Sequence, residues 1–462
     1  MKQIRPMLVS RRVFLSMVAA GLAWPQTRPD EQSGSDMIVR AKRPEDLEMP
    51  AAGFSDFVTS IDHFFVRTHV AVPDVDLATW RLKIEGHVST PLTLSMDELR
   101  RMPSFELPAV LECAGNGRSF YEPTVAGLQW TNGAVGNGRW RGVRLSDLLQ
   151  RAGLKPGTVE ILFDGADVPI GSMADFQRSI PVKKALQPST LLAYEMNGQT
   201  LPIKHGFPLR AIVPGWAGNS WVKWVTNIRV LNEEANGFWM KNAYLYPSKP
   251  VAPGSSPPAD IMKPVTSLRV KSIIGSPADG STVEIGKSVL ISGTAWSGEA
   301  GRVTGVDVSL DRGRTWRPAT LAGDTTAFGW RLWKFLWTPH SQGFYTILSR
   351  ARDTSGDVQP LVEEWNPSGY LWNVVGRVDL GAGIQPDAGG AVSSPVSNVV
   401  PPQSFLDTCL TCHDEDVITQ QRLTHSQWDR EVNKMVGWSA QVPADTRSAL
   451  LDYLQGIAGP RP

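Results

Sequence analysis

The stretch Leu111-Glu112-Cys113-Ala114-Gly115-Asn116-Gly117-Arg118 is the most informative part of this chain for its fold. An apolar approach leads into a glycine-rich turn, which places the Cys113 thiol where backbone can come close to a ligand. The Arg118 guanidinium, five residues on, can lower the pKa of a thiol or bind an anion. On this stretch alone, a metal-ligating thiolate and a buried structural cysteine are both open.

The residues on either side of this stretch, from 45 to 246, mix short apolar runs with brief helical patterns. Residues 82–84 and 209–213 are apolar runs bounded by Gly and Pro, as strands are, whereas residues 146–152 have a helical pattern. The mixture predicts an α+β domain. The polar, acidic stretch before it, as far as Glu48, is expected to be an irregular lead-in.

Several segments of the chain resemble the sulfite oxidase family. In that family one cysteine thiolate binds a molybdenum that also holds a pterin dithiolene and oxo groups, and Cys113 with its Ala-Gly-Asn-x-Arg tail resembles the loop that supplies it. The resemblance extends over about residues 50 to 378 and implies a sulfite-oxidase-type molybdopterin domain with a molybdenum-molybdopterin cofactor. The other matching segments, in the family's order, are Phe64-Phe65-Val66-Arg67-Thr68-His69, 192–198, 205–210, 221–224, 308–316 and 351–353.

The resemblance implies a role for each matching residue. Cys113 would ligate molybdenum, and Arg67 and Arg118 match the arginines that hold an oxyanion substrate, a task suited to a planar and permanently charged group. Tyr244 matches the tyrosine near the equatorial oxo group, and Trp130 matches an aromatic wall of the pocket. The positions that match pterin or pterin-phosphate contacts are His69, Asp167, His205, Arg210, Trp221, Val222 and Lys223.

One segment departs from the family pattern. Sulfite-oxidising members carry a further arginine in Trp-Asn-x-Arg-Gly, whereas this chain has Trp365-Asn366-Pro367-Ser368-Gly369-Tyr370. Because Ser368 brings no positive charge, a sulfite dianion would meet two guanidinium groups here instead of three. The segment is more similar to that of sulfane dehydrogenases, which oxidise protein-bound sulfur.

From residue 265 to 380 the pattern changes to short strands separated by turns. The turn Ser276-Pro277-Ala278-Asp279-Gly280 leads into an expected strand at 281–285, and further strands are expected at 289–293 and 306–310. Regularly spaced short strands predict an immunoglobulin-like β-sandwich. By resemblance it would be a dimerisation domain, which implies a homodimer.

Residues 381–403, rich in Gly, Ala, Ser and Pro, are expected to form a flexible linker to a small α-helical cytochrome c domain at 404–462. That domain contains Cys409-Leu410-Thr411-Cys412-His413, which matches the C-x-x-C-H attachment motif of c-type haem. The two thiols would form thioethers with the haem, and His413 would bind its iron. A zinc or dithiol redox site is the alternative, although zinc would need a second Cys/His pair.

The second axial ligand of the haem should follow the motif. Met435 is the predicted ligand, because a thioether sulfur raises the potential of a haem that must accept electrons. His425 is the rival ligand. The alternative role of Met435 is packing in the hydrophobic core.

The first 26 residues predict the cellular compartment. The junction Ser10-Arg11-Arg12-Val13-Phe14-Leu15-Ser16 precedes an apolar run to Trp24 and is identified as a twin-arginine export signal. The apolar run is short for a membrane span. We therefore expect a periplasmic protein with no span after signal cleavage, and a retained anchor is the alternative.

The composition limits the classes of function. A formal net charge of +1 offers no field suited to a polyanion, which argues against a nucleic acid partner. The motifs predict a molybdopterin-dependent sulfite dehydrogenase of the cytochrome c type. It would act on a small sulfur oxyanion or on protein-bound sulfur, and its electrons would pass from molybdenum to haem and on to an external cytochrome c or similar acceptor. The alternatives are a sulfane dehydrogenase, an S-oxide reductase of the same fold, and an electron carrier without catalysis.

Overall fold

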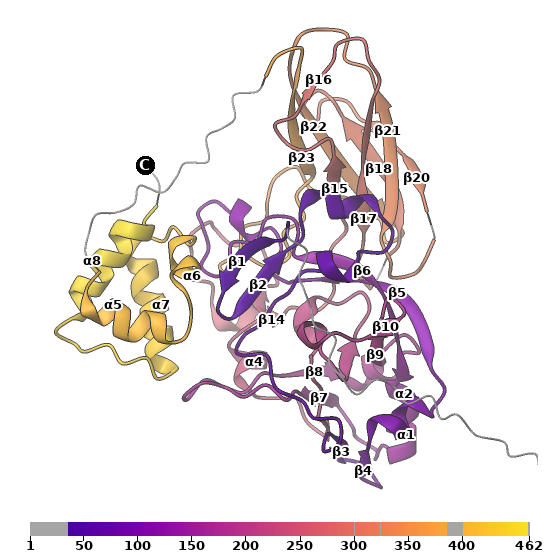
Figure 1. Ribbon diagram of the computed structural model, residues 1–462, viewed down its shortest axis with the longest axis vertical. Coiled ribbons are helices and arrows are strands. Elements are labelled where there is room, and N and C mark those ends of the chain that lie inside the picture. Colours follow the sequence, from indigo (N-terminus) through magenta and orange to yellow (C-terminus); the bar gives the residue numbers. More distant parts are fainter. Residues whose placement is uncertain (1–35, 300, 324, 386–400, 461–462) are drawn as a thin grey trace, which may run out of the picture.

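The computed structural model describes residues 36–460 except 300, 324 and 386–400. The predicted signal at 1–26 lies outside these residues, as does most of the linker predicted at 381–403. Three bodies are arranged side by side (Figure 1): a mixed helix-and-sheet domain, a β-sandwich above it, and a small helical domain to its left. We call them the catalytic domain, the sandwich and the C-terminal domain.

Two five-stranded sheets form the frame of the catalytic domain. In the first, strand order is β10-β9-β6-β5 with β11 also on β9, and in the second it is β4-β3-β12-β7-β8, where only the β3–β12 pairing is parallel. Apolar side chains from both sheets share one core. The strands are β3 Leu82–Gly86, β4 Leu92–Leu94, β5 Phe105–Glu112, β6 Val135–Arg144, β7 Glu160–Asp164, β8 Gln177–Pro181, β9 Leu191–Met196, β10 Gln199–Thr200, β11 Arg210–Ile212 and β12 Asn227–Leu231.

Helices in this domain are short and their ends are set by local sequence. Ser95 caps α1 by accepting a hydrogen bond from the Glu98 amide, and Gly153 ends α2 in a left-handed conformation at φ 71°. The helices are α1 Met96–Arg100, α2 Leu145–Ala152, α3 Val182–Ala185 and α4 Phe238–Lys241, with single 3-10 turns η1 Ala51–Ser55, η2 Ile61–His63, η3 Arg118–Phe120, η4 Ile203–His205, η5 Gly218–Ser220 and η6 Ala259–Ile261.

A hairpin precedes the catalytic sheets. Strands β1 Ile38–Lys42 and β2 Glu45–Glu48 pair antiparallel, so the irregular lead-in expected before residue 48 is wrong from residue 38 onward. Leu47 and Val66 exchange backbone hydrogen bonds of 2.9 Å in each direction. The hairpin thereby fixes the segment that carries Arg67 and His69. A second antiparallel pair, β13 Leu245–Pro247 with β14 Met262–Pro264, lies between the catalytic sheets and the sandwich in the sequence.

Two sheets pack face to face in the sandwich, and their inward side chains form one core. The expected strand at 281–285 is only two residues long, because a turn closed by Lys287 N to Glu284 O and a left-handed Gly286 interrupt it. One sheet has the order β15-β17-β21-β20 and the other β16-β23-β22-β18-β19. Their bounds are β15 Lys271–Ser276, β16 Thr282–Val283, β17 Val289–Trp296, β18 Val303–Ser309, β19 Arg317–Pro318, β20 Thr320–Ala322, β21 Arg331–Trp337, β22 Gly343–Asp353 and β23 Gly376–Ala382.

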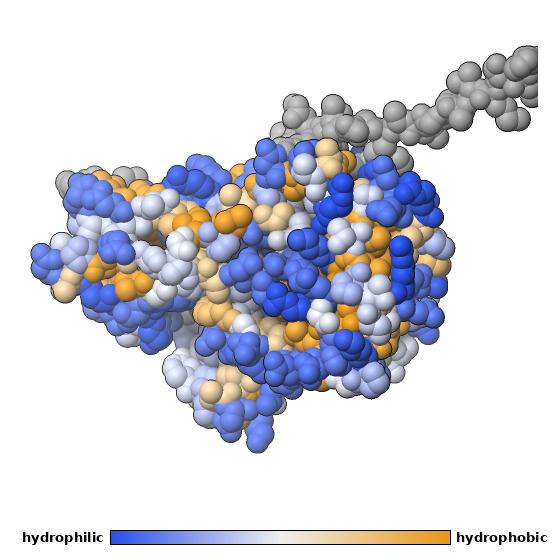
Figure 2. Space-filling view, turned by 90° about the horizontal axis from the view of Figure 1, so that it is seen from below, coloured by the Kyte–Doolittle hydropathy of each residue, from blue (hydrophilic) through white to orange (hydrophobic). Residues whose placement is uncertain are grey.

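Four helices and one 3-10 turn make up the C-terminal domain: α5 Gln403–Thr408, η7 Cys409–Thr411, α6 Glu415–Thr419, α7 His425–Gly437 and α8 Arg447–Ala458. Leu450, Leu451 and Leu454 of α8 are buried together in its core, as their spacing predicts. Seen from below, this domain forms a lobe that abuts the main body, with hydrophilic and hydrophobic residues mixed over the exposed face (Figure 2). None of the helices in the described ranges has the length and apolar character of a transmembrane segment.

Candidate active site

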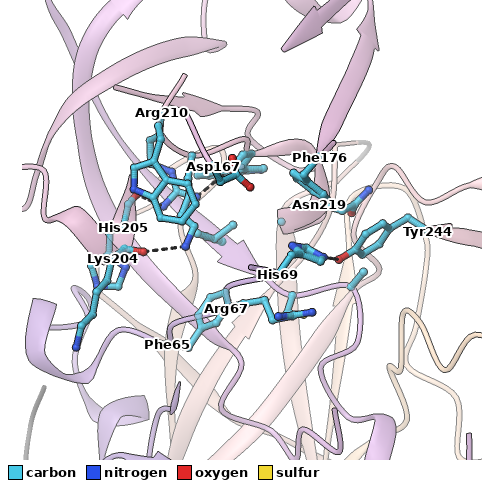
Figure 3. Close-up of a pocket in the computed structure, with 17 residues that line it drawn as sticks. Phe65, Arg67, His69, Asp167, Phe176, Lys204, His205, Arg210, Asn219 and Tyr244 are labelled. Atoms are coloured by element: carbon cyan, nitrogen blue, oxygen red, sulfur yellow. Dashed lines mark hydrogen bonds between the residues drawn. The ribbon is translucent and has the colours of Figure 1, made fainter. Parts of the chain in front are cut away.

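A cavity opens in the catalytic domain, lined by loops that follow or precede its strands. Concave sites of this kind, with a few convergent polar groups, are typical of cofactor and small-molecule binding. Figure 3 shows Lys204, His205 and Arg210 grouped at one side, and His69 and Tyr244 at the other. The lining residues are Phe65, Arg67, His69, Leu111, Cys113, Ala114, Asp167, Phe176, Lys204, His205, Arg210, Gly218, Asn219, Trp221, Lys223, Trp224 and Tyr244.

The Cys113 thiol lies at the end of β5, where the chain leaves the sheet. Its amide donates to the Ala134 carbonyl and its carbonyl accepts from the Asn116 amide, each at 2.9 Å, so both sides of the turn are fixed. Burial raises the pKa of the thiol, while the Gly115 amide and the charges of Arg118 and Arg67 oppose that shift. Burial keeps the Cys113 thiol protonated, and a metal binds a cysteine as its thiolate, so metal binding would displace this proton. The position therefore fits a metal site.

The residue before the thiol ties this loop to the sandwich. Glu112 is buried, and its carboxylate accepts from Lys271 Nζ at 3.0 Å, from Trp296 Nε1 at 2.8 Å and from Asn116 Nδ2 at 2.9 Å. Lys271 begins β15 and Trp296 ends β17. The position of the Cys113 loop therefore depends on the second body of the molecule.

Arg118 is buried beside the thiol loop, in a channel walled by glycines, and, like Trp130, it is not among the residues that line the cavity. A Cβ at Gly115, Gly127 or Gly369 would lie 2.7 to 2.9 Å from an atom of the Arg118 side chain, so any other residue would displace it. Its Nη1 donates to the Leu128 carbonyl at 3.0 Å and its Nη2 to the Ser368 carbonyl at 3.2 Å, while its Nε has no partner in the described structure.

Ser368 therefore lies next to Arg118, at the place where the family pattern has a third arginine. Its hydroxyl donates to the Leu245 carbonyl at 2.7 Å. The Leu371 amide, three residues on, donates to the Ala114 carbonyl at 2.9 Å. The segment that departs from the family pattern is thus packed directly on the thiol loop.

Arg67 approaches the same cavity from the segment held by the first hairpin. Its Nη1 lies 3.3 Å from the buried Asp46 carboxylate and donates to the Thr68 carbonyl. Burial raises the pKa of Asp46 to about 6, against the opposing charge of Arg67. This carboxylate was not found from the sequence, because its only signal is a partner 21 positions away.

Tyr244 and His69 form a hydrogen-bonded pair at the far side of the cavity. Their Oη and Nε2 atoms are 2.6 Å apart, and Tyr244 has a left-handed backbone at φ 53°. Such a conformation is costly for a bulky residue and is concentrated at functional sites. Burial, reinforced by Arg67, Lys223 and Arg178, lowers the pKa of His69 well below its usual value, so the imidazole is neutral.

Cations gather at the other side of the cavity. Arg210 donates only to the backbone carbonyls of His205 and Trp221 in the described structure, at 2.8 and 3.2 Å, and burial alone lowers its pKa to about 9. Burial and the Arg210 charge lower the pKa of Lys223 to about 7. The buried Arg210 Nε also has no partner. Buried cations without a carboxylate partner fit an anion such as a phosphate.

The remaining predicted residues of the cavity divide into three groups. Asp167 and Trp221 line it, and burial raises the pKa of Asp167 to about 6. Val222 is buried behind the wall, where its carbonyl accepts from the Ala211 amide. Trp130 corrects the prediction of an aromatic wall: it is fully buried in the core and does not line the cavity. Phe176 takes that place, with its ring stacked on His69 at 4.4 Å.

Four further residues near the cavity escaped the sequence analysis. Asn219 lines it with a buried Oδ1 that has no partner, and the rings of Tyr244 and Tyr370 stack at 5.4 Å. Arg178 lies 5.5 Å from the Tyr244 ring, and Lys204 accompanies His205. Tyr370 stood in a quoted motif, but the other three have no signal apart from their place in the fold.

In the C-terminal domain, the residues of the haem motif lie on η7 and just beyond it. Cys409 is half-buried and Cys412 exposed, and both thiols are free. His413 has a buried Nδ1 without a partner, and burial lowers the pKa of its imidazole, which keeps it neutral as an iron ligand must be. Free thiols and a neutral, partly buried imidazole fit a c-type haem.

The structure separates the two residues considered as the second ligand. Met435 on α7 is half-buried and is not among the residues of the C-terminal core. His425, at the start of the same helix, is exposed and faces Asp452 at 3.7 Å. Met435 remains the predicted ligand.

Known proteins that are similar to this chain include molybdopterin oxidoreductases. Residues 69–239 match the oxidoreductase molybdopterin binding domain, and residues 262–382 match the Mo-co oxidoreductase dimerisation domain. Mitochondrial sulfite oxidase of Rattus norvegicus is 38% identical over 74% of this chain, a match that spans 65% of its own length, less than two thirds. Sulfite oxidase of Gallus gallus is 37% identical over 72% of this chain and 75% of its own. Among solved structures, the sulfane dehydrogenase SoxCD from Paracoccus pantotrophus is similar, with a TM-score of 0.63 and 28% identity over 81% of this chain and 94% of that one.

Proposed function

Because this chain belongs to the sulfite oxidase family of molybdopterin oxidoreductases, we propose that it oxidises a sulfur compound at the Cys113 cavity and passes the electrons to a c-type haem in its C-terminal domain. The observation that supports this proposal most directly is the set of side chains in the cavity. It combines one half-buried thiol with a buried guanidinium, Arg210, that donates only to backbone carbonyls in the described structure.

The wall of the cavity opposite Tyr244 is the place for the cofactor. When bound, the molybdenum-pterin group supplies oxygen-atom transfer and takes two electrons from sulfur. Cys113 would hold the metal, and Arg210, Lys223 and His205 would hold the anionic end of the pterin. Neutralisation by a phosphate would offset the cost of burying the charges of Arg210 and Lys223.

Substrate would bind between Arg118, Arg67 and Tyr244. Arg118 is held by backbone carbonyls and lies 5.1 Å from the Tyr370 ring, so its charge is not neutralised by a carboxylate in those contacts. The charge of Arg67 is partly offset by Asp46. The Tyr244 hydroxyl would donate to an oxygen of the substrate or cofactor, since its neutral partner His69 can accept or donate in turn.

A sulfane substrate is the second candidate, and Ser368 favours it. The residue lies beside Arg118 and adds no charge, so the site has less positive charge than a small dianion prefers. The structural likeness to a sulfane dehydrogenase points the same way. A bulkier or protein-bound sulfur would need fewer cations and more room.

The proposal also covers the cellular compartment, the oligomeric state, the haem ligands and the electron acceptor of the enzyme. The twin-arginine motif supports export to the periplasm, where c-type haem is attached, and the match to a dimerisation domain supports a homodimer. His413 and Met435 would bind the haem iron, with Cys409 and Cys412 in thioether links. An external cytochrome c or similar protein would then take the electrons one at a time.

The proposed function can be tested by absorption spectroscopy, because the haem band changes when the haem is reduced. Purified protein is mixed under anaerobic conditions with sulfite, thiosulfate or a protein-bound persulfide, and the haem band is followed. We expect reduction by at least one of them, and the fastest donor identifies the substrate class. A fully haem-loaded preparation with less than roughly a tenth of an equivalent of molybdenum would instead favour a plain electron carrier.

A further inference from the structure

An aromatic contact joins the C-terminal domain to the wall of the cavity. Trp438, just after α7, packs against Phe238 and Trp239 of α4 with ring centroids 5.8 and 6.0 Å apart. The Trp239 ring lies 5.1 Å from His69 and 6.2 Å from Tyr244. The Trp239 indole therefore lies between the cavity residues and the C-terminal domain. On the side of the C-terminal domain, Met435 is three positions before Trp438.

Polar contacts beside Trp438 require a close approach of two segments of the chain, at residues 171–172 and at residue 439. Ser172 Oγ and Ser439 Oγ are 2.5 Å apart, and the Ser172 amide donates to the same Ser439 oxygen at 3.2 Å. A Cβ at Gly171 would lie 3.2 Å from Ser439 Cβ, and both residues have left-handed backbones, at φ 59° and 77°. A left-handed serine is unfavourable alone, so this contact stabilises a conformation that the chain does not prefer.

A second contact lies on the loop that holds the substrate arginine. The Gln420 side chain accepts from the Gln129 amide at 2.9 Å and donates to the Arg40 carbonyl at 2.8 Å. The buried Gln421 Oε1 accepts from the Gly127 amide at 3.1 Å. Between those two amides lies Leu128, whose carbonyl accepts from Arg118.

The haem motif lies at the same interface. Arg43 donates to the Leu410 carbonyl at 2.6 Å and lies 3.7 Å from Asp414, while the Gln427 amide group donates to the Thr124 carbonyl at 3.0 Å. The hydrogen bonds between the domains approach the roughly ten of a specific protein interface. Figure 1 shows the C-terminal domain against β1 and α4, as these contacts require.

We propose that the surface formed by residues 40–43, 124–129, 170–173 and 238–239 is a docking site for the C-terminal domain of the same chain, and that this docked position is the one in which electrons leave the cavity. The inference rests on the proposed function for the presence of the haem. Each turnover would add one oxygen atom from water to the sulfur and release two protons and two electrons. Each electron would reduce the haem iron from Fe(III) to Fe(II), with an external one-electron acceptor removing the first before the second passes. The domain would need no travel between oxidation and transfer.

A disulfide between the two serines tests the position. In the protein loaded with molybdenum and haem, which occupies the native thiols, the Ser172→Cys/Ser439→Cys variant should form an intramolecular disulfide in most molecules, seen by peptide mapping. The matched control is Ser172→Cys/Ser448→Cys, since the exposed Ser448 of α8 makes no hydrogen bond to the catalytic domain in the described structure. Bridging no better than in the control, or a covalent dimer, would overturn docking within one chain.

Electron transfer in the bridged protein tests the second half of the proposal. Haem reduction by sulfite in stopped flow should stay within about twofold of the Ser172→Cys variant, because no domain movement is needed. Loss of haem reduction in a protein that is fully bridged would show that electrons pass in another position and would overturn the proposal.

A side-chain variant on the C-terminal domain gives an independent measure of the same surface. In the paired-cysteine background, Gln420→Ala should slow bridging by up to about thirtyfold, because two interdomain hydrogen bonds of about 1 kcal/mol each are lost. Gln403→Ala, exposed on α5 and bonded only to Asp407 in the described structure, should change nothing. Equal rates in the two variants would contradict the assigned surface. A wild-type haem that no sulfur compound reduces would refute the proposed function, whereas the bridging rates report only on docking.

Discussion

The Cys113 cavity and the Cys409–His413 motif both present thiols for a redox group, but they are built in opposite ways. Residues from 65 to 244 converge on the cavity, where buried charges are already held by hydrogen bonds. The motif is five consecutive residues with one thiol exposed, on a small domain with a small core. The difference indicates that the cavity is formed before a cofactor binds, whereas the proposed haem would add to the small core of the C-terminal domain.

The largest expected effect comes from replacing one thiol in each of the two regions. Cys113→Ser should lower substrate-driven haem reduction by more than about 1000-fold, more than the loss of one transition-state hydrogen bond costs, and should leave the c-type spectrum intact. Cys412→Ser should instead disturb haem attachment and leave the molybdenum content unchanged. Absorption spectra and metal analysis check both. A Cys113→Ser protein that still reduces its haem at the original rate would refute the metal role of this thiol.

The buried ion pair beneath the thiol loop tests whether the cavity is preformed. Lys271→Met leaves Glu112 buried without its cation, which should cost about 3–5 kcal/mol in the free energy of unfolding of the catalytic domain. The control Lys287→Met removes an exposed pair with Glu284 and should cost less than about 1 kcal/mol. Denaturant unfolding followed by tryptophan fluorescence measures both. Equal losses would mean that the tie to the sandwich contributes nothing.

The cationic side of the cavity should bind anions in a pH-dependent way, because Lys223 titrates there. With the pKa of Lys223 lowered to about 7 by burial and Arg210, an anion binds with uptake of a proton and more tightly as the pH falls. Cofactor-free protein should bind sulfate roughly tenfold more tightly at about pH 6 than at about pH 8. Calorimetry should show that Lys223→Met loses this dependence and that exposed Lys241→Met keeps it. The same pH dependence in both variants would assign the proton to another group.

The smallest effect distinguishes hydrogen bonding from packing inside the cavity. Tyr244→Phe keeps the ring stacked on Tyr370 but removes the hydrogen bond to His69, so turnover should fall about three- to tenfold, as for one hydrogen bond of about 1 kcal/mol. Tyr345→Phe, which removes a hydroxyl from the sandwich surface, is the control. The turnover of both variants is measured at steady state, with rates expressed per haem from its absorption spectrum. A larger loss for Tyr345→Phe would place the important hydroxyl elsewhere.

Local patterns predicted much of the fold, and they failed where long-range contacts decide. The helix at 146–152 and the strands near 82 and 289 follow from local sequence patterns, because each packs its apolar side chains into the core of its own domain. The first hairpin was missed, since its polar strands are stabilised by pairing with each other and with Val66. Trp130 was misplaced because a position in sequence does not tell which face of the loop its ring occupies.

The sequence by itself determined which groups lie next to one another in both regions. The lone thiol of a glycine-rich turn and the thiols and imidazole of a C-x-x-C-H motif are set by covalent spacing, which folding cannot alter. Only the tertiary structure decided what surrounds them. Phe176 lines the cavity, and Asp46 and Tyr370 contact its residues Arg67 and Tyr244, all from distant segments. Trp438 packs against Trp239 across two domains. Burial and charge act through space, so the electrostatics of the cavity and the docking of the C-terminal domain depend on distances that no local pattern records.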